Sequence, residues 1–284
     1  MLKPLDDAAI ARAERLAGTD DLWFETAQTI DARNAGVIGD GVTDNTATLQ
    51  RLLDGGNRTI HLPAGDYVTG KLEFSANTML LLEPGVVLRD SGRLAEQERL
   101  LNIRVDNVRI AGLGARLIAN RSHYTTGEYR HGVYIFGAHH VLVEGLESTG
   151  HGGDGFYIGG PPNNPSTDVR LKGCRADSNR RQGLSITSAR RVQVIDCEFV
   201  NTNGTAPQFG IDLEPNYPVD FMHELIFIRP RTSGNRGGGL MVHLNRLDSS
   251  SAPVDIIIVG HVSENEGVRL RVDSPAGVTA VVHY

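Results

Sequence analysis

The sequence FGIDLEPN, residues 209–216, has the pattern of a short β-strand, and this pattern decides the fold of the chain. Along a strand, residues i and i+2 point to the same face, about 7 Å apart. Asp212 and Glu214 therefore project together, while Ile211 and Leu213 point to the opposite face. The stretch predicts a strand with one apolar face and one acidic face.

The same frame recurs along the chain as a glycine followed by an apolar, a variable and a second apolar residue. Successive glycines lie 23, 28, 27, 29 and 28 residues apart, and a second series of short apolar strands lies between them. Short strands that repeat every ~20 to 50 residues, without helical periodicity, are typical of a solenoid in which each coil stacks on the next. We therefore predict an all-β fold, a parallel β-helix. The repeats begin at Gly132, Gly155, Gly183, Gly210, Gly239 and Gly267.

Composition and local patterns define the expected organisation. The 284 residues include 33 glycines and only 6% aromatic residues, as thin stacked coils with many turns require. We expect residues 1–28 to form an N-terminal helical segment and residues 29–284 to form a single β-helix domain. A short helix near residues 44–54 is expected to cap the first coil. Cys174 and Cys197 occupy matching positions in neighbouring repeats, which predicts an inward stack of two cysteines and is also compatible with a disulfide.

The charge of the chain bears on its partners. A net charge of −6 and a pI near 5.9 argue against a nucleic-acid partner, because such binding draws its affinity from basic patches. An acidic polysaccharide remains compatible, because Arg180 and Arg181 can contribute to a local basic groove. The N-terminus has no apolar run of a signal peptide, and no 18-residue apolar stretch occurs. We expect no membrane partner, and either a cytoplasmic protein or one exported by a route that the sequence does not show.

The C-terminal end of the predicted solenoid lacks a cap. The chain stops at Val281–Tyr284, within a coil and without a following helix. An uncovered apolar edge tends to pair with another chain. We therefore expect either that the natural chain continues or that another subunit covers this end, as in a homo-oligomer such as a trimer.

Three successive runs near the N-terminus together contain turns, one predicted helix and several short predicted strands. They read AGVIGDGVTDNTATLQRLLDGG (35–56), IHLPAGDYVTGKLEF (60–74) and NTMLLLEPGVVLRDS (77–91). This order resembles the opening of the pectin-lyase-like superfamily of right-handed β-helices. The superfamily includes polygalacturonase-type glycoside hydrolases, proteins with a pectate-lyase-like domain and phage tailspike depolymerases. The resemblance implies a right-handed helix and a carbohydrate substrate that lies along one of its faces.

The polygalacturonase pattern would place an Asn-Thr-Asp, an Asp-Asp, a Gly-His-Gly and an Arg-Ile-Lys on successive coils. The present repeats contain Gly150-His151-Gly152 and a single Asp154, without an Asp-Asp pair or an Arg-Ile-Lys. The Gly-His-Gly also precedes the other acidic residues instead of following them. The resemblance therefore indicates the fold and leaves the reaction open.

Outward-pointing residues of the predicted strands define a candidate site. Asp212 and Glu214 are expected about 7 Å apart, and Asp154, two coils away, about 10 Å from Asp212. Inverting glycosidases hold their carboxyl groups ~6.5 to 9.5 Å apart, whereas retaining enzymes need ~5 to 5.5 Å. We predict that Asp154, Asp212 and Glu214 are catalytic, one as a general acid with a pKa raised by its like-charged neighbour and another as the base. The residues two positions after each glycine are Tyr134, Tyr157, Ser185, Asp212, Met241 and Arg269.

Residues around these acids are expected to bind the substrate. Arginine can clamp a uronate or sulfate, asparagine can bond sugar hydroxyls, and tyrosine offers a stacking platform. The predicted substrate-binding residues are Tyr134, His151, Tyr157, Arg180, Arg181, Gln182, Asn203, Asn216 and His243.

Two alternatives to a glycoside hydrolase remain open. The first is a polysaccharide lyase or uronate C5-epimerase that acts on an acidic polysaccharide. In that case the carboxylates bind Ca²⁺ or neutralise the uronate, and Arg181, His151 or Tyr157 removes the proton beside the carboxyl group. The second is a non-catalytic carbohydrate-binding or tailspike-like structural module. The hydrolase itself is expected to use neither a metal nor a cofactor.

Overall fold

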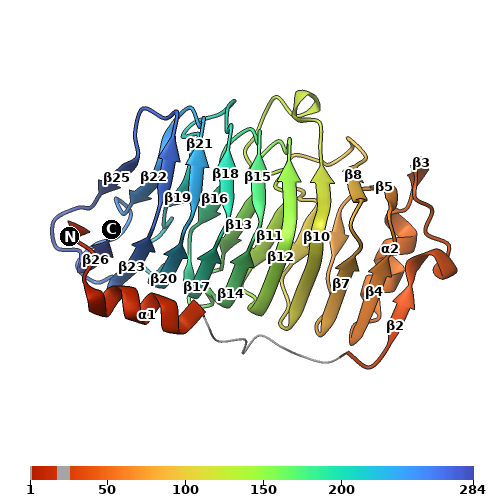
Figure 1. Cartoon of the computed structure of the whole chain (residues 1–284), viewed down its shortest axis with the longest axis horizontal. Helices are drawn as coiled ribbons and strands as arrows, with labels where there is room; N and C mark the ends of the chain where they lie inside the picture. Colours follow the sequence, from red (N-terminus) through yellow and green to blue (C-terminus); the bar gives the residue numbers. More distant parts are fainter. Residues whose placement is uncertain (1, 18–25) are drawn as a thin grey trace.

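The protein is a parallel β-solenoid of about nine turns, and Figure 1 shows it from the side with its long axis horizontal. The computed structural model describes residues 2–17 and 26–284. The predicted fold class is confirmed, because the described chain is mostly β and carries short helices near its N-terminus. Residues 18–25 of the predicted N-terminal segment lie outside the described residues.

The helical elements of residues 2–17 and 26–284 are few. The α-helices are α1 (Asp7–Ala17) and α2 (Thr46–Asp54), and the 3-10 helices are η1 (Ala32–Ala35) and η2 (Arg121–His123). Among the described residues, no helix combines the length and the apolar character needed to cross a membrane.

The described strands form two sheets of parallel strands. The smaller sheet has eight strands: β6 (Leu72–Glu73), β9 (Leu101–Ile103), β11 (Val133–Phe136), β13 (Phe156–Gly159), β16 (Leu184–Ile186), β19 (Phe209–Leu213), β22 (Gly238–His243) and β25 (Leu270–Asp273).

In the part of the chain that the structure describes, the larger sheet has eighteen strands. They are β1 (Leu2–Lys3), β2 (Thr29–Asp31), β3 (Asp40–Asp44), β4 (Arg58–Leu62), β5 (Gly65–Thr69), β7 (Thr78–Leu82), β8 (Val86–Asp90), β10 (Val108–Ile118), β12 (His139–Thr149), β14 (Ser166–Lys172), β15 (Arg175–Asp177), β17 (Ala189–Ile195), β18 (Glu198–Val200), β20 (Met222–Ile228), β21 (Arg231–Ser233), β23 (Val254–Val259), β24 (Val262–Glu264) and β26 (Ala280–His283).

The core is a set of stacked apolar rows inside the coils. Phe156, Phe199 and Phe227 are fully buried, each on a different coil. Cys174 and Cys197 are buried free thiols, and the backbone N–H of Cys174 donates to Cys197 Sγ at 3.4 Å. The predicted inward cysteine stack is therefore confirmed, and the two residues form no disulfide.

The register of the eight-stranded sheet decides which outward side chains share a line. The predicted line is confirmed as far as Met241, but its last member is wrong. Met241 pairs with Arg271, and not with Arg269, because the turn before β25 is two residues longer than the alignment on Gly267 allows. An even shift keeps a side chain on the same face and only moves it along the strand. The confirmed line runs through Tyr134, Tyr157, Ser185, Asp212 and Met241.

The N-terminal residues return to the far end of the solenoid. Strand β1 pairs with β26, and the backbone N–H of Tyr284 donates to the carbonyl of Lys3. The expected open edge at the last coil is therefore wrong for β26, because a strand of the same chain covers it. Strand β25 still lies at the end of the eight-stranded sheet. A homo-oligomer stays a prediction.

Helix α1 packs on the outer face of the larger sheet, beside β20 and β23 (Figure 1). Its buried Ala9 and Ala13 contact an outward apolar patch of isoleucines on that sheet. Arg12 pairs with Glu224 at 2.8 Å and with Asp255 at 2.7 Å. The helix therefore covers a patch that would otherwise expose apolar surface to water. The patch consists of Ile195, Ile226, Ile228 and Ile257.

We predict that Ala13→Glu lowers the free energy of unfolding by about 2 kcal/mol or more, because it places a carboxylate against this patch. Ala11→Glu is the matched control, since Ala11 is exposed on the same helix. Denaturant unfolding, together with limited proteolysis of the first 17 residues, measures both effects. Equal stability of the two variants would contradict the packing of α1.

Candidate active site

A cavity of about 470 Å³ lies over the outward side chains of the eight-stranded sheet. Its floor comes from β13, β16 and the residues just before them. One wall is the segment between η2 and β11, and another is the loop that follows β19. The lining residues are Glu128, Tyr129, His131, Tyr157, Arg181, Ser185, Thr187, Glu214, Asn216, Tyr217 and Arg246.

Arg181 lies at the centre of the charged groups. Its guanidinium approaches Glu128 at 3.4 Å, Asp154 at 3.7 Å and Glu214 at 3.5 Å. Burial alone would lower the pKa of this side chain, but the surrounding carboxylates, with Asp154 first, raise it above its usual range. Arg181 is therefore a permanent cation.

Asp154 lies beneath this cation, just before β13. Its side chain is fully buried, and burial raises the pKa of its carboxyl group to about 6, against the opposing charge of Arg181. The backbone N–H of Asp154 donates to Nδ1 of His131 at 2.9 Å. An accepting Nδ1 places the imidazole proton on Nε2. His131 is therefore neutral, and its 3.4 Å approach to the Asp154 carboxyl group is not an ion pair.

The charge state of His131 agrees with this assignment. Its side chain is 2% exposed, and burial lowers its pKa well below the usual value. Its ring stacks on Tyr157 at 4.9 Å between centroids, and Tyr157 stacks on Tyr134 at 5.1 Å. Arg99 covers the Tyr134 ring at 4.4 Å. The stacked rings hold the imidazole at the edge of the cavity.

Asp212 and Glu214 have different environments although they are two residues apart. Asp212 is 1% exposed, and burial raises the pKa of its carboxyl group to about 8, with the charge of Glu214 as the next cause. Glu214 follows the end of β19, lines the cavity, and its side chain is 35% exposed. One carboxyl group therefore keeps a proton at neutral pH, and the other faces the cavity.

Gln182 orients Asp212. Its side-chain Nε2 donates to Asp212 Oδ2 at 2.5 Å, and its Oε1 accepts the backbone N–H of Phe209 at 2.7 Å. These two bonds define which end of the amide is the donor. Gln182 is itself fully buried, so it contacts Asp212 and not the cavity.

The structure brings part of the predicted site together. Tyr157, Arg181, Glu214 and Asn216 line the cavity. Asp154, Asp212 and Gln182 lie buried beneath it, and Tyr134 is buried in the ring stack. The four remaining predicted residues lie elsewhere.

Arg180 and His151 are not among the lining residues of the cavity. Arg180 donates to the carbonyls of Gly127 at 2.5 Å and Thr125 at 2.8 Å, so it anchors the segment before β11. His151 is fully buried, burial lowers its pKa to about 3, and its backbone N–H donates to Asn179 at 2.9 Å. The contacts of both residues therefore stabilise the coil and its turns.

Asn203 and His243 also lie outside the cavity lining. Asn203 is exposed, and its backbone carbonyl accepts a bond from Arg121 at 2.6 Å. His243, at the end of β22, lies 3.4 Å from Asp273 on the neighbouring coil. Neither side chain joins the group around Arg181.

Several lining residues are not predicted by the repeat. Glu128 and Tyr129 belong to the segment between η2 and β11, which has no counterpart in the repeat. Tyr217 and Arg246 belong to the loops after β19 and β22. The length of these connections is the signal in the sequence, but it does not show which of their side chains turn toward the sheet.

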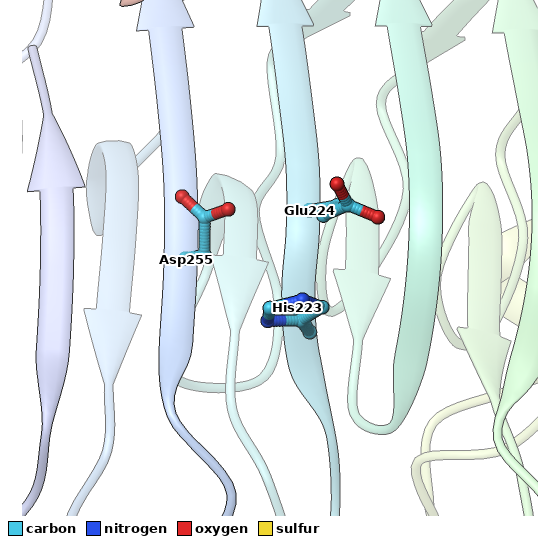
Figure 2. Close-up of side chains that lie close together, drawn as sticks. All are labelled: His223, Glu224 and Asp255. Carbon is cyan, nitrogen blue, oxygen red and sulfur yellow. The ribbon is translucent and has the colours of Figure 1, made fainter.

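One group of potential metal ligands occurs among the described residues, and it is remote from the cavity. His223, Glu224 and Asp255 bring ligand atoms within 4.8 Å of one another on β20 and β23 (Figure 2). Both carboxylates of this group pair with Arg12, so a cation of the protein already occupies it. Within the described chain, Asp154 and Glu214 instead approach the guanidinium of Arg181. A Ca²⁺ site at the cavity stays a prediction.

Comparisons with known proteins agree with the fold. The family described as "Right handed beta helix region" matches residues 67–245. "Uncharacterized protein YclG" of Bacillus subtilis (strain 168) is 25% identical over 221 residues, which cover 65% of this chain and 38% of that protein.

Two solved structures illustrate the fold relationship. A Family 28 exopolygalacturonase of Yersinia enterocolitica is 15% identical, with a TM-score of 0.67 over 89% of this chain and 57% of the other. The tailspike protein gp49 of Acinetobacter baumannii bacteriophage Fri1, described as a capsular polysaccharide depolymerase, is 14% identical, with a TM-score of 0.62 over 90% and 50%. The chain spans less than two thirds of the length of all three of these relatives.

The raised pKa values predict a dependence of stability on pH. For Asp212 the pKa of about 8 in the folded protein lies above that of the unfolded chain, near 4. Folding therefore binds a proton, and stability falls as the pH rises from about 4 to 8. Asp212→Asn removes this loss, so it should exceed the wild type in stability above pH 8, by about 1.4 kcal/mol for each unit of pKa shift.

Thermal unfolding of the wild type and the variant at pH 4, 6 and 8.5 measures the effect, and the two should converge at pH 4. Asp154→Asn is the internal comparison. Its gain should be complete near pH 6, because the pKa of Asp154 is about 6. A constant difference between Asp212→Asn and the wild type across this range would contradict a buried protonated carboxyl group.

Proposed function

Since the chain belongs to the family of right-handed β-helix proteins, we propose that its cavity binds a carbohydrate chain and hydrolyses a glycosidic bond in it. The exopolygalacturonase and the tailspike depolymerase, which act on polysaccharides, share this fold. The observation that carries the proposal is the contrast between Asp212 and Glu214. A carboxyl group whose surroundings raise its pKa, so that it holds a proton at neutral pH, is the usual source of the general acid in glycoside hydrolysis.

The pair Asp212 and Glu214 supplies the general acid. Asp212 holds a proton at neutral pH, because its pKa is about 8. Glu214 is the exposed member and reaches the substrate in the cavity. The pair shares the proton, and the glycosidic oxygen receives it as the bond breaks. Gln182 keeps the buried carboxyl group in place.

A second carboxylate must activate water. Arg181 contacts Asp154, Glu128 and Glu214, which places the other two carboxylates within about 10 Å of Glu214. This limit is compatible with the ~6.5 to 9.5 Å separation of inverting enzymes. Arg181 also offsets the repulsion among these negative charges.

Hydrolysis fits the geometry better than elimination. Elimination needs a base beside the substrate that is unprotonated at the working pH. Arg181 has a raised pKa, and His151 is buried outside the cavity lining. Burial also raises the pKa of Tyr157, whose hydroxyl bonds Thr187 at 2.9 Å. The three candidate bases of a lyase are therefore unsuited to the task.

Binding alone fits the site less well. Burying Asp154 and Asp212 disfavours their ionised forms and costs stability. A surface that only binds sugars has no need of such groups, whereas a catalytic acid that keeps its proton at neutral pH requires a raised pKa.

We predict that the wild type releases reducing ends from at least one member of a panel of acidic and neutral polysaccharides. The panel contains polygalacturonate, alginate, ι-carrageenan, xylan and dextran. No ultraviolet absorbance of an unsaturated uronate should accompany the release. Asp212→Asn and Glu214→Gln should each lower the rate by ~10²- to 10⁴-fold, because each removes part of the general acid.

Glu147→Gln is the control, because Glu147 lies on β12 of the larger sheet and bonds Thr149. It should keep the rate of the wild type. Absorbance that rises together with the reducing ends would indicate elimination instead. Silence of both signals with every polysaccharide would favour a binding module.

A further inference from the structure

The carboxylates around Arg181 divide into two buried and two exposed groups. Asp154 and Asp212 are 0% and 1% exposed, and neither lines the cavity. The side chains of Glu128 and Glu214 are 55% and 35% exposed, and both line it. A substrate in the cavity therefore meets Glu128 and Glu214, while Arg181 covers Asp154.

Glu128 approaches the same guanidinium as Glu214. Its Oε2 lies 3.4 Å from Nε of Arg181, and Oε2 of Glu214 lies 3.5 Å from Nη2. The carboxylates of Glu128 and Glu214 therefore lie on the same guanidinium group, within about 10 Å of each other.

The segment that carries Glu128 is anchored on both sides of it. Before Glu128, Arg180 donates to the carbonyls of Thr125 and Gly127. After Glu128, Arg130 donates through its Nε to the carbonyl of Leu94 at 3.1 Å. Arg130 also lies over the ring of Tyr124 at 4.7 Å. A side chain on a segment held by several bonds is positioned before the substrate arrives, which a catalytic group needs.

We propose that Glu128 is the catalytic base, the carboxylate that activates water in the reaction proposed above. This inference rests on the proposed hydrolysis and assigns its base. The oxygen of water forms a bond to the anomeric carbon, and Glu128 takes the proton of that water. The bond from the anomeric carbon to the leaving oxygen breaks, and that oxygen takes the proton of the Asp212 and Glu214 pair. Asp154 is then a positioning residue that holds Arg181 in place.

The test separates the base from the acid by the leaving group. The substrate is the 2,4-dinitrophenyl glycoside of the sugar found at the new reducing ends of the cleaved polysaccharide. Its leaving group needs little protonation, so Glu214→Gln should keep most of the wild-type rate. Glu128→Gln should lose ~10²- to 10⁴-fold in kcat with little change in KM, because the water still needs a base. The matched control is Glu96→Gln, an exposed glutamate outside the cavity lining, which should react like the wild type.

Rescue by azide is a second measurement, and it distinguishes a catalytic base from a residue that only maintains the structure. In Glu128→Ala, azide should restore turnover and yield a glycosyl azide of inverted configuration, since azide needs no base. The wild type should give a product of inverted configuration by proton NMR. Circular dichroism checks that each variant is folded, and Glu128→Gln, which keeps the size of the side chain, serves if Glu128→Ala is not.

Failure of the Glu128 assignment can be distinguished from failure of the proposed hydrolysis. Full activity of Glu128→Gln with an active wild type would overturn the assignment and leave hydrolysis standing. A product of retained configuration would also overturn it, because Glu128 or another carboxylate would then act as a nucleophile. A wild type that releases no reducing ends from any polysaccharide of the panel overturns both proposals.

Discussion

Parallel hydrogen bonding between successive coils is the constraint on which the rest of this structure depends. Residues 20 to 33 positions apart in sequence are held side by side, at the ~4.8 Å spacing of neighbouring strands. Tyr134 and Tyr157 stack at 5.1 Å for this reason, and Ser185 lies next to Asp212. Outward side chains at matching positions of neighbouring coils lie next to each other whatever their charge. A solenoid with several acidic residues on one face must therefore offset the repulsion between them.

The protein meets this electrostatic cost in two ways. Arg181 lies among the carboxylates and neutralises part of their charge, and burial leaves Asp212 protonated at neutral pH. Asp154 is intermediate, since its pKa is raised by burial and lowered by Arg181. The two buried acids weaken the fold at high pH, in the way expected where chemistry and stability compete for the same residues. The site therefore has a cost in stability that an ordinary solvated face of the solenoid would not have.

Periodicity explains what could be predicted from the sequence. The line from Tyr134 to Met241 and the cysteine stack follow from the repeat alone, because the register of the strands is kept from coil to coil although the turns differ in length. The burial of a side chain, in contrast, does not follow the repeat. Asp212 and Glu214 share a face, yet one is buried and the other exposed, because burial depends on Arg181, Gln182 and the neighbouring loops. The return of β1 to β26 also leaves no periodic signal, since it is a contact between the two ends of the chain. Residue type and proximity to the repeat also predict His151 and Asn203 for the site, but neither residue lines the cavity.

A regular solenoid presents a nearly flat ladder, so a cavity forms only where segments outside the repeat rise from it. Here the segment before β11 and the loops after β19 and β22 supply the walls, while the strands supply the floor. The proposed acid belongs to the repeat, and the proposed base belongs to an inserted segment. This division lets one scaffold change its chemistry by exchanging loops while the coils and their hydrogen bonds stay the same. It also explains why likeness to solved structures at 14–15% identity describes the coils well and says little about the reaction. Many of the residues that determine the reaction lie in the loops between the strands, where the repeat imposes no common sequence.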